Sequence, residues 1–172
     1  MGKVYDGIDA KLADWIRRQR LFFVATAPSS GGHVNLSPKG PIETLTIVDR
    51  RTIEYVDHVG SGAETIAHLR DNGRICVMLC SFDGPPRIVR LHGRGSFAAD
   101  ADPGREGVRG VVRVEIDRIS DSCGYGVPLM EYVGERPQRA LWLERKGADG
   151  VRDYVRDKNA LSLDGLPALT PR

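Results

Sequence analysis

Hydrophobic side chains recur at two different periods along the chain. The change of period separates a helical N-terminal part from a part made of strands. Over residues 8–20 they fall at the spacing of an amphipathic helix, with charged side chains between them. From residue 21 onwards, short runs rich in β-branched and aromatic residues follow one another, separated by turn sequences such as PSSGG and PKGP. We therefore predict an N-terminal helix over 8–20 and a meander of about seven strands within residues 21–120.

Helical patterns interrupt and follow these strands. Residues 63–70 (AETIAHLR) predict a short helix with Ser61 as N-cap and Glu64 three positions later, ended by Asn72-Gly73. A C-terminal helical segment is expected over residues 128–160, with helices around 137–146 and 151–159. This order predicts a mainly β fold with flanking helices, an antiparallel Greek-key-like barrel in a single domain over residues 1–172.

The charge pattern narrows the class of partner. The chain has 25 Lys and Arg against 23 Asp and Glu, a net charge of +2, and the two signs are interspersed. Neither nucleic acid nor an anionic membrane is therefore an expected partner. The first residues lack an apolar signal region, no stretch approaches the roughly 18 apolar residues of a membrane span, and the three cysteines lack metal-type spacing. We expect a cytoplasmic protein whose ligand is a small molecule.

The first candidate binding motif is NLSPKG, in which a predicted strand that carries Asn35 and Ser37 runs into a Pro-Lys-Gly turn that presents Lys39. Lys39 could meet a phosphate group or the edge of a flavin ring, and Gly40 would let a ligand approach the backbone. An ordinary hairpin with a solvated lysine explains the same spacing equally well.

The second candidate motif opens the short predicted helix. Ser61 and Gly62 precede it and Thr65 lies in its first turn. Backbone N–H groups and the positive end of the helix dipole meet there, which favours an anion. A capped helix start with no ligand is the simpler interpretation of Gly-Ser-Gly alone.

Further candidates are basic and aromatic side chains in the second half of the chain. Arg87 and Arg90 belong to a predicted strand and could supply guanidinium groups to a phosphate, although each could equally be a surface arginine. Tyr125, in the turn SCGYGVP, could stack on a planar ligand or simply pack.

The sequence contains no recognisable catalytic set. It shows no Ser/His/Asp, Cys/His or carboxylate pair, so the catalytic residues are unknown. The histidines lack metal-ligand spacing, and no metal site is predicted from His33, His58, His68 and His92.

Taken together, these motifs resemble the pyridoxamine 5'-phosphate oxidase family and its relatives, the FMN-binding split-barrel proteins. The resemblance covers roughly residues 22–120 and rests on the order of GHVNLSPKG, GSGAETIAHLRDNGRI, ICVMLCSF and RIVRLHGRG. It implies an FMN-binding split barrel that forms a homodimer, with FMN at the subunit interface.

The resemblance also implies roles for particular residues. Flavin contacts fall to Ser37 and Lys39, and phosphate contacts to Ser61, Gly62, Thr65 and either Arg87 or Arg90. The vitamin-processing oxidases carry Ser-x-Lys at the start of the small helix, whereas this chain has Ala63-Glu-Thr65 there. The chain therefore looks closer to relatives that keep Ser-Pro-Lys-Gly, for which the resemblance supplies no substrate.

The leading hypothesis is an FMN-dependent oxidoreductase that acts on an unidentified small molecule. Alternatives are an F420-dependent reductase on the same fold, a non-catalytic protein that binds flavin or haem, and a dimeric structural module without a ligand. The sequence names neither the electron donor nor the acceptor.

Overall fold

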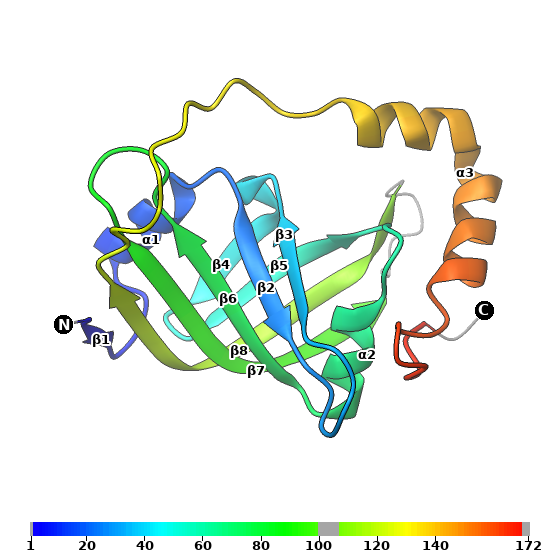
Figure 1. Cartoon of the computed structure of the whole chain (residues 1–172), viewed down its shortest axis with the longest axis horizontal. Coiled ribbons are helices and arrows are strands. Elements are labelled where there is room, and N and C mark those ends of the chain that lie inside the picture. The colour runs from blue at the N-terminus through cyan, green and yellow to red at the C-terminus, as the bar shows by residue number, and fades with distance from the viewer. Residues whose placement is uncertain (1, 100–106, 170–172) are drawn as a thin grey trace.

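The computed structural model of the protein describes residues 2–99 and 107–169; residue 1, residues 100–106 and residues 170–172 of the predicted domain lie outside this description. Within these ranges one antiparallel sheet of eight strands curves around a common core (Figure 1). Its order is β3-β2-β6-β7-β8-β5-β4, with β1 paired to β8. The strands are β1 (Val4–Tyr5), β2 (Phe22–Thr26), β3 (Asn35–Lys39), β4 (Leu45–Asp49), β5 (Thr52–His58), β6 (Arg74–Cys80), β7 (Ile88–Ala99) and β8 (Val108–Ser122). The predicted mainly β, antiparallel class is confirmed.

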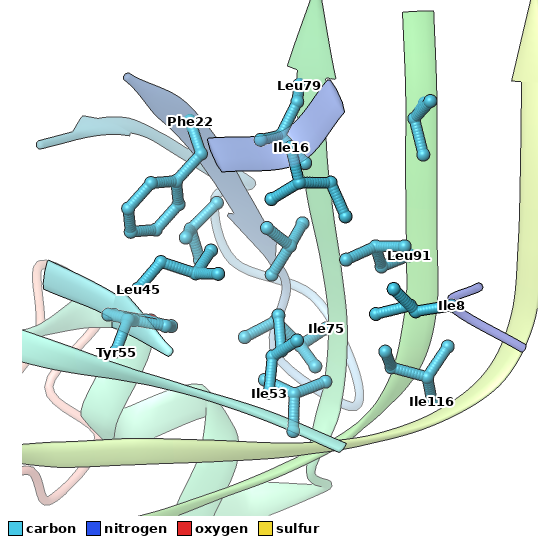
Figure 2. Close-up of a cluster of buried hydrophobic side chains, with 14 of the residues drawn as sticks. Ile8, Ile16, Phe22, Leu45, Ile53, Tyr55, Ile75, Leu79, Leu91 and Ile116 are labelled. Carbon is cyan, nitrogen blue, oxygen red and sulfur yellow. The ribbon is translucent and has the colours of Figure 1, made fainter. Parts of the chain in front are cut away.

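The N-terminal helix α1 (Ala10–Arg17) is shorter than its predicted range. It begins where the Asp9 carboxylate accepts a hydrogen bond from the Leu12 N–H at 2.8 Å, an N-cap that satisfies one free donor of the first turn. Its apolar face is buried, and Figure 2 shows Ile16 of this helix beside Leu79 of β6. The helix thus contributes its apolar face to the barrel core.

The barrel core is made of alternating side chains of the strands. Val77 and Leu79 of β6 and Val89 and Leu91 of β7 are fully buried, while the residues between them are partly exposed. Figure 2 shows Leu79 and Leu91 in one cluster with side chains from β4, β5 and β8. Both strands therefore turn one face toward the core.

A bulge in β8, at Asp117, lies opposite a point of β7 where the two backbones come close together. The register between β7 and β8 shifts at Gly93, where a Cβ atom would overlap the backbone oxygen of Glu115. We expect Gly93→Ala to lower the free energy of unfolding by about 1–3 kcal/mol, because the added methyl group has no room. Urea unfolding measures this, with Gly126→Ala as the control, since open space surrounds Gly126. Equal stability of the two variants would contradict the expectation.

Helix α2 (Glu64–Asp71) lies beside β2, β6 and β7. The predicted cap is wrong: the N-cap position is Ala63, which offers no side-chain acceptor, and Ser61 is exposed outside the helix. The predicted end is confirmed, because Asn72 caps the helix and Gly73 follows with a φ of 73°. The start of α2 therefore lacks a side-chain cap.

The C-terminal helix α3 (Gln138–Lys158) is interrupted at Gly147, whose φ of 65° breaks the helical backbone. The two pieces correspond to the two helices predicted around 137–146 and 151–159. Residues 128–136 form no helix, and this segment crosses from the α1 end of the barrel to the α2 side (Figure 1). No helix of the described segments has the length and apolar character needed to cross a membrane.

Two carboxylates hold the loop between β2 and β3. Asp71 accepts hydrogen bonds from the Ser29 N–H at 2.6 Å and hydroxyl at 3.0 Å, and Asp164 accepts one from the His33 N–H at 2.8 Å. The backbone hydrogen bond from Ser29 lowers the pKa of Asp71, and the backbone hydrogen bond from His33 lowers the pKa of Asp164. A lowered folded-state pKa means that these bonds stabilise the loop above the unfolded pKa and are lost as pH falls through the folded pKa.

We therefore expect the amide resonances of Ser29 and His33 to move when pH drops below about 4, as the two carboxylates take up protons. A ¹H–¹⁵N titration measures this. In Asp71→Asn the Ser29 resonance should lose its titration, while that of His33 should keep it. A Ser29 shift that still titrates in this variant would assign the effect to another group.

Candidate functional site

A pocket of about 400 Å³ opens between β3, the end of β5 and the start of α2. This volume lies in the range of small-molecule sites. Single arginines of β8 and α3 complete its wall. The lining residues are Asn35, Ser37, Pro38, Lys39, Gly40, Val56, His58, Val59, Gly60, Ser61, Gly62, Glu64, Thr65, Arg109 and Arg139.

The strand β3 presents its polar side chains in alternation. Asn35 and Ser37 pair in register with Thr26 and Val24 of β2, and Lys39 pairs with Phe22. Directly paired residues of an antiparallel sheet point to the same face, so the three polar side chains of β3 share the face that carries the buried residues of β2. The sheet thereby directs Asn35, Ser37 and Lys39 together into the pocket.

A buried carboxylate supports the floor of this pocket. Asp57 of β5 is fully buried, and its two oxygens are met by Lys39 Nζ at 3.1 Å and by Arg109 Nε at 2.8 Å. Arg109 also donates to the backbone oxygen of Gly62 at 2.7 Å. A buried charge requires such partners, and here one carboxylate holds two cations in place.

The phenol of Tyr55 lies fully buried near this cluster. Burial raises the pKa of Tyr55 well above its usual range, and the negative charge of Asp57 adds to the effect. Tyr55 therefore stays a neutral phenol at neutral pH and adds no charge to the pocket.

The charges that line the pocket are predominantly positive. Lys39, Arg109 and Arg139 face it, against the single carboxylate of Glu64. Asp57 lies behind the wall and balances only one of its two partners. The uncapped start of α2 adds backbone N–H groups at the same place, so the pocket is suited to an anion.

Hydroxyl and amide groups form the neutral part of the wall. The Asn35 amide donates to the Thr65 hydroxyl at 3.0 Å, and the Ser37 hydroxyl donates to the Asn35 amide oxygen at 2.8 Å. Thr65 belongs to α2 and the other two to β3, so these bonds join the strand to the helix start. The pocket thus combines fixed cations with positioned hydroxyl groups.

The comparisons with known proteins agree with this architecture. The chain matches the family described as pyridoxamine 5'-phosphate oxidase over residues 8–123. It is also 39% identical to the pyridoxamine 5'-phosphate oxidase family protein ustO of Aspergillus flavus, in an alignment that covers 96% of this chain and 77% of that protein. The chain belongs to the pyridoxamine 5'-phosphate oxidase family. The resemblance inferred from its motifs is therefore confirmed.

One solved structure shows the same fold as this family member. A conserved hypothetical protein of Mycobacterium tuberculosis superposes with a TM-score of 0.51 at 17% identity, covering 74% of this chain and 92% of that protein. An FAD-binding protein of Mycobacterium smegmatis gives a TM-score of 0.47 at 15% identity, covering 70% and 96% of the two chains. At these identities only the fold of the first can be transferred.

The family member brings six of the residues singled out in its sequence into one pocket. They come from the two motifs NLSPKG and GSGAET, and are Asn35, Ser37, Lys39, Ser61, Gly62 and Thr65. The convergence of the two motifs on one cavity is what a shared ligand requires. That these residues bind a cofactor stays a prediction.

The other three candidates lie elsewhere. Arg87 donates to the Tyr5 hydroxyl at 2.6 Å and lies over the ring of Trp15 at 4.9 Å, so it ties the N-terminal segment to the sheet. Arg90 donates to Ser122 at 3.2 Å, and Tyr125 is 82% exposed. None of the three lines the pocket formed by the described residues.

The sequence reasoning missed Asp57, Arg109 and Arg139. Alternation along β5 contained a signal for the first, because it places Asp57 on the same face as the buried Ile53 and Tyr55, where a carboxylate needs a cation. Arg109 is the second residue of β8, and Arg139 lies in α3, far from the other pocket residues in sequence. No local pattern marks either of these arginines.

Proposed function

We propose that the protein is an FMN-dependent oxidoreductase that acts on a small molecule, and that the pocket holds the FMN phosphate. The observation that carries the proposal is the charge arrangement around Asp57. Lys39 and Arg109 share one buried carboxylate next to the uncapped start of α2, so positive charge remains for a ligand. A phosphate would supply the negative charge that balances the second cation. Its oxygens would accept hydrogen bonds from the backbone N–H groups at the start of α2.

The residues present fit a phosphate group well. Arg109 is almost fully buried and held by two acceptors, so its guanidinium is positioned before any ligand arrives. Thr65 and Ser61 add hydroxyl groups at the helix start. When bound, FMN supplies hydride or electron transfer, while this chain binds and orients the cofactor.

We also propose that a second copy of the chain completes the site. No Phe, Tyr or Trp lines the pocket among the described residues, so one copy offers no aromatic ring to stack on a flavin. The outward face of the neighbouring strands is apolar: Leu36 pairs with Ala25, and Phe23 pairs with Met78. Leu36 is 66% exposed, and the extended connection adds Leu129 and Val133 at 79% and 94%. A partner subunit would cover this surface.

Fluorescence titrations of the dimeric protein with FMN, riboflavin and F420 test the proposal. We expect FMN to bind more tightly than riboflavin by at least about tenfold, since only FMN carries the phosphate. Tighter binding of F420 than of FMN would assign the pocket to the deazaflavin instead. If FMN bound but the bound flavin were neither reduced by NAD(P)H nor oxidised by a substrate, the protein would be a flavin carrier. That result would contradict the proposed oxidoreductase activity.

A further inference from the structure

A histidine lies buried behind the pocket wall and does not line the pocket. His68 of α2 is fully buried, and its Nδ1 lies 3.0 Å from the hydroxyl of Thr26. Its Nε2 is buried without a hydrogen-bond partner among the described residues. A buried imidazole with one anchored nitrogen raises the question of what its tautomer controls.

The Thr26 hydroxyl connects His68 to the pocket. It accepts a hydrogen bond at 3.0 Å from the Asn35 amide, whose second N–H goes to Thr65. The Asn35 oxygen in turn accepts from Ser37. His68, Thr26 and Asn35 therefore form one continuous path that ends at two hydroxyl groups of the pocket wall, Thr65 and Ser37.

The path has a direction, because each donor hydrogen can be used once. The Thr26 oxygen accepts from Asn35, and His68 Nδ1 is placed to accept the hydrogen of the Thr26 hydroxyl, so we assign that hydrogen to Nδ1. The imidazole is then neutral, with its proton on Nε2. Burial lowers the pKa of His68, which favours the neutral ring.

The direction fixes what the pocket offers to a ligand. Thr65 receives a hydrogen bond from Asn35, so its own hydrogen is left to donate into the pocket. Ser37 has given its hydrogen to Asn35, so its oxygen is left to accept. A proton on Nδ1 of His68 would allow every bond to reverse, with the Asn35 amide turned over, and Thr65 would then face the ligand as an acceptor.

We propose that His68 is a positioning residue that, through Thr26 and Asn35, keeps Thr65 a hydrogen-bond donor to an anionic oxygen and Ser37 an acceptor. The pocket then selects ligands that present a phosphate oxygen to Thr65 and a hydroxyl or N–H group to Ser37. A phosphate dianion has only acceptors, so a phosphate oxygen beside Thr65 is compatible with this direction, in which Thr65 donates, and not with the reverse. This inference rests on the proposed phosphate site. It adds which hydroxyl group of the pocket wall donates a hydrogen bond to the ligand and which accepts one.

The experiment combines a spectroscopic signature with matched variants of the full chain. The ¹⁵N resonances of the His68 ring in ligand-free protein should show the Nε2–H tautomer at neutral pH. Thr26→Val should weaken FMN binding about threefold to tenfold with riboflavin binding unchanged, whereas Thr26→Ser, which keeps the hydroxyl, should bind FMN like the original protein. Thr65→Val and Thr65→Ser should repeat this contrast with a larger loss for valine.

An Nδ1–H tautomer, or equal FMN affinity of Thr26→Val and Thr26→Ser, would overturn the inference. The ring resonances need no flavin. If FMN failed to bind while His68 showed the Nε2–H tautomer, the direction of the path would be supported and the proposed function would fall by itself.

Discussion

Replacing Asp57 with Asn is expected to lower the free energy of unfolding by about 3–5 kcal/mol, the loss typical of removing one partner of a buried ion pair. Arg109 is held at 4% side-chain exposure and would keep its charge without the carboxylate that balances it. Lys39 would lose its partner as well. Urea unfolding followed by circular dichroism measures the effect.

The matched control is Glu54→Gln, which removes the partner of Arg113 in another strand-to-strand ion pair. Here the two side chains are 43% and 36% exposed, so water screens their charges. We expect a change of about 0–1 kcal/mol for this variant. An Asp57→Asn protein as stable as Glu54→Gln would show that the buried carboxylate does not hold the cations of the pocket.

Replacing Lys39 with Met is expected to weaken FMN binding by about 10-fold to 100-fold, the range for losing one charge-assisted hydrogen bond. Methionine keeps the length and apolar stem of lysine and removes only the charge. Riboflavin binding should change little, because it has no phosphate. Fluorescence titration of both ligands gives the two affinities for each protein.

The control for the Lys39 variant is Arg17→Met, which also removes one positive charge. Arg17 lies on α1, exposed and paired with Asp14, and does not line the pocket. We expect this variant to bind FMN with the same affinity as the unsubstituted protein. An equal loss of FMN affinity in Arg17→Met would show that the effect comes from net charge alone. An equal loss of affinity for FMN and riboflavin in Lys39→Met would show that Lys39 does not contact the phosphate.

Local patterns were sufficient to predict most of the fold. The change from a helical period to short strands and the Asn72-Gly73 stop of α2 are each determined by neighbouring residues, and the structure confirms them. The cap of α2 was mispredicted because that prediction also used neighbouring residues alone. A capping box requires the helix to begin at the residue after Ser61, whereas tertiary packing buries Ala63 and Ile66 against Ala168 and begins the helix later.

The site could be predicted only where its residues are neighbours in sequence. NLSPKG and GSGAET each indicate an anion site locally, and the barrel brings both to one pocket. Arg109 reaches the pocket only because β8 pairs with β5, which places it beside Asp57. Arg87 satisfied the local pattern equally well, but its partners Tyr5 and Asp121 come from distant segments and direct it to the N-terminal end.

The absorption spectrum of freshly purified protein, with mass analysis of the ligand released on unfolding, tests the central claim most directly. The account predicts the two visible bands of a bound flavin and a released molecule with the mass of FMN. For colourless preparations, incubation with FMN followed by gel filtration should yield the same spectrum. A folded protein that remains colourless after this treatment, with Lys39 and Arg109 intact, would contradict the assignment of the pocket to FMN.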